Sequence, residues 1–171
     1  KVQFPIHIFH QDLALIPYLI FISNEIAVVK QPLYNYFSND DGISQTSSQK
    51  HIESIFQAIQ FLVKLFEASD KEYNHELLIK VALLNYRYNF SLRKAKYSDK
   101  QLLSFTSLFK KELNALNIDF LKFINDEQGR ELYSMIKIEL IKRGLPVNIL
   151  NSISIDDIDE LFSQIDLLIK Q

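Results

Sequence analysis

Residues 48–66 read SQKHIESIFQAIQFLVKLF, and this stretch decides the fold class of the chain. Its apolar residues recur at intervals of three and four, which is the spacing of one face of an α-helix. That face comprises Ile52, Ile55, Phe56, Ile59, Leu62, Val63 and Phe66. Ser47 or Ser48 is suited to cap the first turn, because a serine side chain accepts hydrogen bonds from free backbone N–H groups. The spacing predicts an amphipathic helix over residues 49–68.

The same helical period continues downstream. A second helix is predicted from about residue 72 to residue 93, with a broad apolar surface. This surface runs through Leu77, Val81, Leu84 and Tyr88 and is widened by Leu78, Ala82 and Leu83. Such breadth predicts a helix at the centre of the core. Ser98-Asp99-Lys100-Gln101 has the S-x-x-Q form of a capping box, which predicts a third helix running on to Leu116.

Three more helical segments complete this part of the chain. Asp119 is suited to cap a short one, and a longer one is predicted over residues 130–142. Gly144 and Pro146 are expected to end it, because glycine accepts the left-handed conformation and proline cannot continue a helix. A last apolar face follows Ser154 and reaches residue 169. We therefore predict five or six helices after residue 47, packed through short loops as a small bundle.

The overall composition excludes several classes of protein. The 171 residues include 19 Lys and Arg against 21 Asp and Glu, and this balance argues against a nucleic-acid binder. The chain has no cysteine, which excludes disulfides and cysteine-based metal sites. Its longest apolar run, residues 13–22, is too short to span a membrane, so we expect a cytoplasmic protein. The chain opens directly on apolar residues after Lys1, which suggests a cut end.

The first 46 residues differ in character from the rest. The run from Ile26 to Val29 is rich in β-favouring residues, and the run from Leu33 to Phe37 is largely aromatic. Both predict strand. A cluster of turn-forming residues occupies positions 38–42. We therefore divide the chain into a β/α segment, residues 1–46, and an all-α domain, residues 47–171.

The first segment also contains an ordered set of short motifs. In order they are Phe4-Pro5, then Gln11-Asp12-Leu13-Ala14-Leu15, an apolar helix, Ile26-Ala27-Val28-Val29-Lys30-Gln31-Pro32-Leu33-Tyr34-Asn35-Tyr36, and Gly42-Ile43-Ser44. Here the sequence resembles the second half of the catalytic domain of family 2 glycosyltransferases, inverting enzymes with the GT-A fold. The match covers residues 4–46. For this segment the resemblance implies a short β/α remnant of a GT-A catalytic domain. Together with the helices predicted after residue 47, this gives a mainly α chain in which the remnant precedes a five- to six-helix bundle.

The resemblance also implies roles for two residues. Asp12 would be the general base that takes a proton from the acceptor hydroxyl as its oxygen attacks the sugar. Gln11 stands where the family pattern usually has Glu, and its amide would bind and orient the substrate. The aromatic strand usually ends in Arg, but Phe37 and Ser38 follow Tyr36 here.

The parent enzyme would use a nucleotide-diphospho sugar, a glycan acceptor and a divalent metal, Mg or Mn. In the family, the metal is held by an Asp-x-Asp motif in the preceding α/β half. This chain has no such motif, and its acidic pairs at residues 40–41 and 156–157 lie in the wrong context. The 171 residues alone are therefore expected to be inactive.

Other interpretations of these residues stay open. Asp12 precedes Leu13-Ala14-Leu15 and is also suited to be a helix N-cap, although Pro17 would disturb or delay that helix. His7, His10 and Asp12 together offer three metal ligands of the kind that zinc or manganese accepts.

The chain as a whole also has a rival interpretation, a non-catalytic helical interaction module. The basic run from Arg93 to Lys96, with Arg87 and Lys100 nearby, is suited to touch an anionic lipid surface or a polyanionic acceptor. Peripheral contact with the inner face of the cell membrane is a further expectation. Insertion of an amphipathic face is disfavoured at this stage, because the bundle core is expected to use every apolar stripe.

Overall fold

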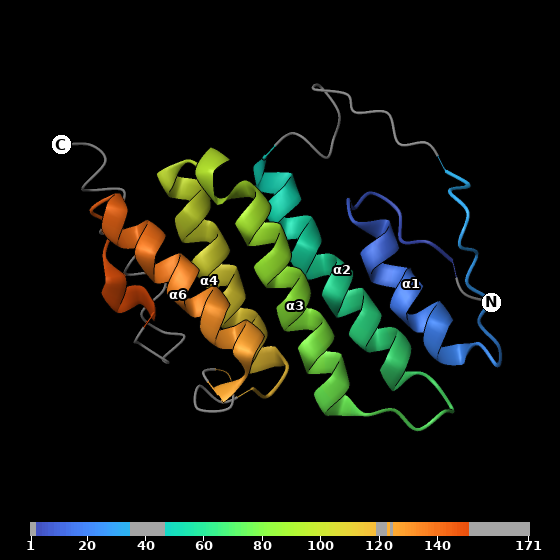
Figure 1. Ribbon diagram of the computed structural model, residues 1–171. Helices are drawn as coiled ribbons and strands as arrows, with labels where there is room; N and C mark the ends of the chain where they lie inside the picture. Colours follow the sequence, from blue (N-terminus) through green and yellow to red (C-terminus); the bar gives the residue numbers. More distant parts are fainter. Residues whose placement is uncertain (1–2, 35–46, 119–122, 124, 151–171) are drawn as a thin grey trace. The chain divides into compact units, whose positions relative to one another are not determined.

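The computed structural model describes residues 3–34, 47–118, 123 and 125–150 (Figure 1). The chain forms two compact units, Lys1–Leu78 and Ile79–Gln171. The described residues are mainly helical and contain no β-strand. A mainly α fold is therefore confirmed, whereas the division of the chain at residues 46 and 47 stays a prediction.

Two helices form most of the first unit, α1 (Gln11–Ile22) and α2 (Gln49–Glu67). The ring of Phe9, just before α1, packs against His51 in the first turn of α2, with ring centroids 4.4 Å apart. Near the other end, Tyr18 and Phe21 pack on Phe66 at 5.6 and 4.7 Å. Because the first turns meet and the last turns meet, the two helices run parallel, as Figure 1 shows.

Helix α2 begins and ends as its sequence predicts. Ser48 is the N-cap, and its hydroxyl accepts a hydrogen bond from the backbone N–H of His51 at 3.3 Å. The His51 side chain completes the capping box by accepting from the Ser48 backbone N–H. The predicted face is mostly buried: Ile52, Ile55, Phe56, Ile59 and Leu62 all lie in the core. Each such side chain contributes about 1.5–3 kcal/mol by leaving water.

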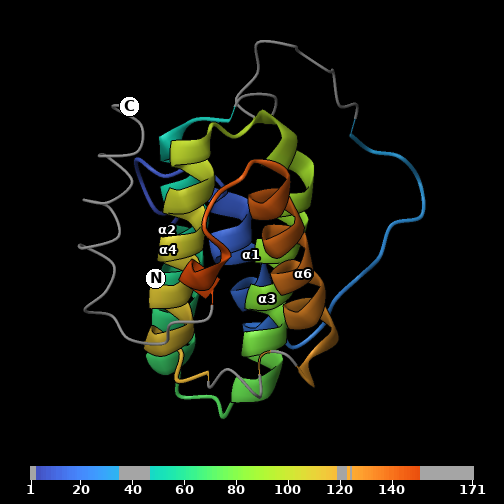
Figure 2. The same ribbon diagram turned by 90° about the vertical axis from the view of Figure 1, so that its left-hand side faces the viewer.

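The second unit contains most of α3 (His75–Arg93), then α4 (Asp99–Ala115) and α6 (Glu127–Lys142). Two short 3₁₀ helices, η2 (Lys94–Lys96) and η3 (Val147–Leu150), accompany them. Ser98 and Gln101 form the predicted capping box of α4. Figure 2 shows α6 beside α3, and the ion pair between Arg87 and Glu131 joins them at 2.7 Å.

A row of aromatic rings fills the interior of this unit. Phe105 of α4 lies 4.9 Å from Phe90 of α3 and 6.2 Å from Tyr97, measured between ring centroids. Phe109 continues the row to Phe123 at 5.3 Å. These rings lie in the core because α3 and α4 each place their aromatic residues three or four positions apart.

Helix α6 ends as predicted. The Gly144 N–H donates to the Ile141 carbonyl at 3.1 Å, and the Leu145 N–H donates to the Leu140 carbonyl at 2.9 Å. This pair of hydrogen bonds requires a residue with a left-handed backbone, and Gly144 has φ 67°. The helix begins three residues earlier than expected, because Asp126 caps it by accepting from the backbone N–H groups of residues 128 and 129.

The structure corrects the predicted face of α3. Leu84 and Tyr88, assigned to the core, are exposed, as is Leu77. Leu78, Ala82 and Leu83, predicted on the same surface, are buried as expected. The buried side also carries Tyr86, Asn89, Phe90 and Arg93. Both faces are rich in apolar residues. The buried one tolerates two polar residues because Arg93 donates a hydrogen bond to the Asn89 side chain at 2.9 Å.

The run from Ile26 to Val29, predicted as a strand, is not assigned as one in the described structure. Residues 25–30 are extended but pair with no other strand in the described part of the chain. The helices expected from Asp119 and after Ser154 fall largely or entirely outside the described residues, as do Tyr36, Phe37 and the turn at residues 38–44.

Candidate functional site

Asp12 and Gln11, the two residues that the family resemblance singles out, lie in the first turn of α1. Both side chains are exposed. Helix α1 starts at Gln11, so Asp12 is the second residue of the helix and not its N-cap. The capping interpretation of Asp12 is therefore wrong, and Pro17 neither delays the helix nor ends it.

His10 occupies the N-cap position instead. Its backbone is left-handed, with φ 59°, and its side chain makes no capping hydrogen bond. The His10 carbonyl accepts the first helical hydrogen bond, from Ala14 N–H at 3.1 Å. A left-handed residue here turns the chain sharply into α1 and directs the His10 ring toward His51, with centroids 6.0 Å apart.

The N-terminal ends of α1 and α2 thus share a small cluster of rings. His51 is buried and lies between the Phe9 ring and the Ser48 hydroxyl, whose oxygen is 3.1 Å from Nδ1 of His51. The ammonium of Lys50 stands over Phe9, 4.9 Å from the ring centroid. Sequence reasoning missed this pairing of histidines. The S-x-x-H spacing at Ser48 was the available clue, because it resembles a capping box.

Metal binding at this end of the first unit is not supported. Among the described residues, no group of three or more histidine, aspartate or glutamate side chains is close enough to hold a metal ion. His7, His10 and Asp12 are thus not brought together as a ligand set. His7 is exposed and left-handed, with φ 66°.

After α1 the chain continues as an exposed, extended segment, residues 25–34. Its apolar side chains face solvent, with Val28 83% and Tyr34 80% exposed. The backbone hydrogen bonds at the end of α1 stop at Ser23, and none is formed by residues 25–34 in the described structure. Such a segment leaves both its β-favouring side chains and its backbone groups without partners.

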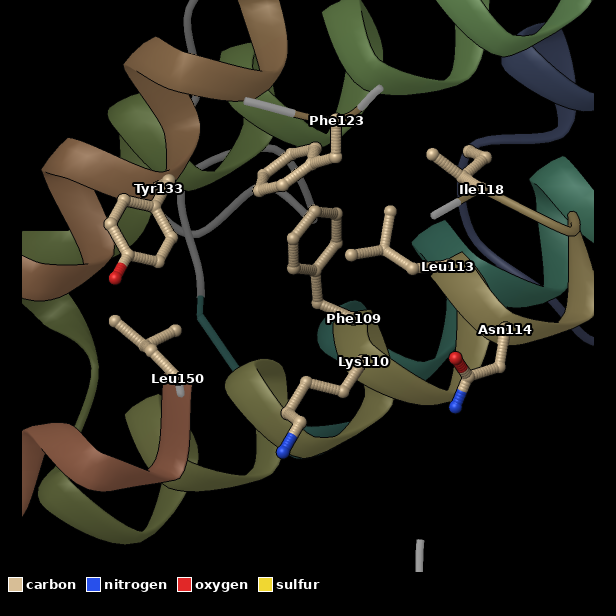
Figure 3. Close-up of a pocket in the computed structure, with 8 residues that line it drawn as sticks. All are labelled: Phe109, Lys110, Leu113, Asn114, Ile118, Phe123, Tyr133 and Leu150. Atoms are coloured by element: carbon tan, nitrogen blue, oxygen red, sulfur yellow. The ribbon is translucent and has the colours of Figure 1, made fainter. Parts of the chain in front are cut away.

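A cavity of about 40 Å³ opens in the second unit, between α4, α6 and η3 (Figure 3). It is lined by Phe109, Lys110, Leu113, Asn114, Ile118, Phe123, Tyr133 and Leu150. Figure 3 shows the rings of Phe109 and Phe123 at its back, with Lys110 and Asn114 on one side. The space accommodates a few water molecules or a short aliphatic group. Among the described residues that line it there is no carboxylate or histidine.

Two buried tyrosines of the second unit have perturbed acidity. Burial, together with the nearby carboxylate of Glu112, raises the pKa of Tyr86 well above its ordinary value. Burial raises the pKa of Tyr97 to about 12, and Arg93 opposes this shift. Both phenols therefore stay protonated at neutral pH, and we assign them to the core.

Comparison of the chain with models of protein families, with curated proteins and with solved structures gives no match. Among the described helices, none combines the length and the apolar character needed to cross a bilayer.

Proposed function

We propose that the chain is the carboxy-terminal part of an inverting, family 2-like glycosyltransferase. In this proposal residues 4–46 complete a catalytic domain whose donor-binding half precedes Lys1. The parent enzyme transfers a sugar from a nucleotide-diphospho sugar to a glycan acceptor.

The observation that carries the proposal is the extended segment that follows α1. Residues 25–34 expose Ile26, Val28, Val29, Leu33 and Tyr34 to solvent. A soluble domain rarely leaves so contiguous a set of β-favouring side chains uncovered. The arrangement is expected of a strand whose neighbours in the sheet belong to another part of the protein.

The position of Asp12 is the second support. An acceptor hydroxyl is a poor nucleophile until a base removes its proton, and the base must approach within ~2.6–3.2 Å. Asp12 is accessible to such a group, and it lies 14 positions before Ile26 in the unpaired segment. Gln11, beside it in the first turn, offers an amide that both donates and accepts hydrogen bonds.

The proposed reaction is a single displacement. Asp12 accepts the proton of the acceptor hydroxyl while the hydroxyl oxygen forms a bond to the anomeric carbon. The bond from that carbon to the diphosphate breaks, and the nucleoside diphosphate leaves with the electron pair. Attack opposite the leaving group inverts the anomeric configuration. In the proposal, Mg or Mn is bound by an Asp-x-Asp motif of the preceding half, as the family resemblance implies.

The test is sugar transfer by the full gene product. Replacement Asp12→Asn preserves size and hydrogen bonding but removes the base, so turnover should fall about 10²–10⁴-fold with donor binding little changed. The matched control is Asp70→Asn, an exposed aspartate between α2 and α3, which should leave turnover unchanged.

Two results would contradict the proposal. One is an Asp12→Asn enzyme as active as the control, which would favour the non-catalytic helical module instead. The other is a gene that encodes no Asp-x-Asp motif on a strand end, roughly one hundred residues upstream of Lys1.

A further inference from the structure

The outer sides of α3 and α6 carry five exposed apolar side chains: Leu84, Tyr88 and Leu92 on α3, and Ile138 and Ile141 on α6. Tyr88 and Ile141 are each 58% exposed. Spacings of three and four residues place each set on one side of its own helix, opposite the side that is buried. We call the surface formed by these five residues the outer face.

The two sets of side chains lie on neighbouring helices. Arg87 of α3 pairs with Glu131 in the second turn of α6, and Arg143 at the end of α6 donates to the Lys94 carbonyl just after α3. Arg87 precedes Lys94 in the chain and Glu131 precedes Arg143, so these two contacts make the helices parallel, as Figure 2 shows. Leu84 lies one turn before Arg87 on α3.

The basic residues of this region surround the apolar ones. Lys137 and Lys142 are exposed and adjoin Ile138 and Ile141 along α6. Lys94 follows the end of α3, beyond Leu92.

The acidic residues of α6 do not cancel this charge. Glu131 is bound to Arg87, and Glu139 is bound to Arg143 at 3.1 Å. The remaining one, Glu127, lies in the first turn, far along the helix from the two isoleucines. The exposed charge near Ile138 and Ile141 is therefore positive.

We propose that the outer face binds the surface of an anionic membrane. The apolar side chains enter the boundary between head groups and acyl chains, and Tyr88 is suited to that depth because its ring is apolar and its hydroxyl is polar. Lys94, Lys137 and Lys142 lie at the level of the lipid phosphates. The complementary charge and the exposed apolar residues act together, since one kind of contact alone gives weak attachment.

The objection raised from the sequence no longer holds. Peripheral insertion was disfavoured because the core was expected to use the stripe through Leu84 and Tyr88. In the structure, the opposite side of α3 serves the core and leaves this stripe in solvent. The cavity beside Leu150 is lined by other residues, so the outer face is not its rim.

The experiment measures binding of the 171-residue chain to vesicles by co-sedimentation, without nucleotide sugar. Vesicles of phosphatidylcholine with about one-third phosphatidylglycerol should bind the chain, and pure phosphatidylcholine should bind it at least tenfold more weakly. Raising the salt concentration should weaken binding. Replacement Lys142→Ala should weaken it about fivefold, whereas Lys111→Ala, an exposed position on α4, should not.

The apolar contribution is tested by the double replacement Ile138→Ser and Ile141→Ser. It should reduce binding at least tenfold, while Val28→Ser, which removes the most exposed large apolar side chain, should not. Both variants change exposed positions, and circular dichroism confirms that they are folded.

Equal binding to neutral and anionic vesicles would overturn the proposal, as would no binding to either. The same holds if Val28→Ser abolishes binding while the double variant does not. Self-association without vesicles that the double variant removes would assign the outer face to a second copy of the chain. Because no sugar transfer is measured, the outcome is independent of the proposed enzymatic function.

Discussion

Arg143 should be the most important charged side chain for the stability of the second unit. Its guanidinium donates to the backbone carbonyls of Tyr97 at 2.6 Å and Lys94 at 2.8 Å, and so ties the end of α6 to the turn between α3 and α4. It also contacts Glu139 at 3.1 Å and Asp99 at 3.2 Å. The Arg143 side chain is only 19% exposed.

The replacement Arg143→Met keeps the length and much of the packing of the side chain while removing all these bonds. Hydrogen bonds to a charged donor contribute about 1.5–3 kcal/mol each, but water reaches the freed carbonyls in part, and the exposed contact to Asp99 contributes little. We expect the free energy of unfolding to fall by about 2–4 kcal/mol. The variant Arg143→Lys should lose most of the same stability, because one ammonium group cannot reproduce the hydrogen bonds of a planar guanidinium.

Urea unfolding followed by far-ultraviolet circular dichroism measures this loss as a lower midpoint with an unchanged slope. The matched control is Arg87→Met, which breaks an ion pair whose side chains are 31% and 48% exposed and should cost less than about 1 kcal/mol. If the two variants lose equal stability, the role assigned to Arg143 is wrong.

Three further changes have defined outcomes. A methyl group added by Gly129→Ala would meet the backbone oxygen of Phe123 and its ring carbons at 2.6 and 2.8 Å, so thermal unfolding should show a loss of about 1–3 kcal/mol despite alanine's higher helix propensity. Ser98→Ala removes the cap of α4 and should lower the free energy of unfolding by about 1 kcal/mol. Urea unfolding should show this loss as a lower midpoint. Between about pH 10 and about pH 12 the unfolded chain loses the Tyr97 proton while the folded one keeps it, so stability should fall as pH rises through this window. Urea titrations across that range should show a smaller fall for Tyr97→Phe.

The four long helices described after residue 47 begin and end at local determinants, and α2, α4 and α6 could be predicted for that reason. Ser48 and Ser98 satisfy free N–H groups three residues away, and Gly144 closes α6 through its own backbone. These interactions depend on neighbouring residues in the sequence and not on the rest of the fold.

The face of α3 could not be predicted, because the helix is apolar on two sides. Leu84 and Tyr88 have the same period as Tyr86 and Phe90, and only the packing of the other helices decides between them. The burial of Arg93 could not be predicted either, because hydrophobic periodicity assigns charged residues to the surface. Its hydrogen bond to Asn89 becomes evident only in the structure.

The run from Ile26 to Val29 forms no strand in the described structure for a related reason. A strand needs a neighbour, and β-favouring residues alone do not supply one. At the candidate site, Asp12 and Gln11 share an accessible helical turn, but the start of the helix was misplaced because the left-handed His10 was not foreseen.

The central claim is that the unpaired segment belongs to the sheet of a catalytic domain. Hydrogen exchange tests it directly, by comparing the amides of residues 27–30 in the full gene product and in the 171-residue chain. We predict that these amides exchange rapidly in the isolated chain and at least 10³-fold more slowly in the full product, as amides do in a paired strand. Equally rapid exchange in both proteins would contradict the claim.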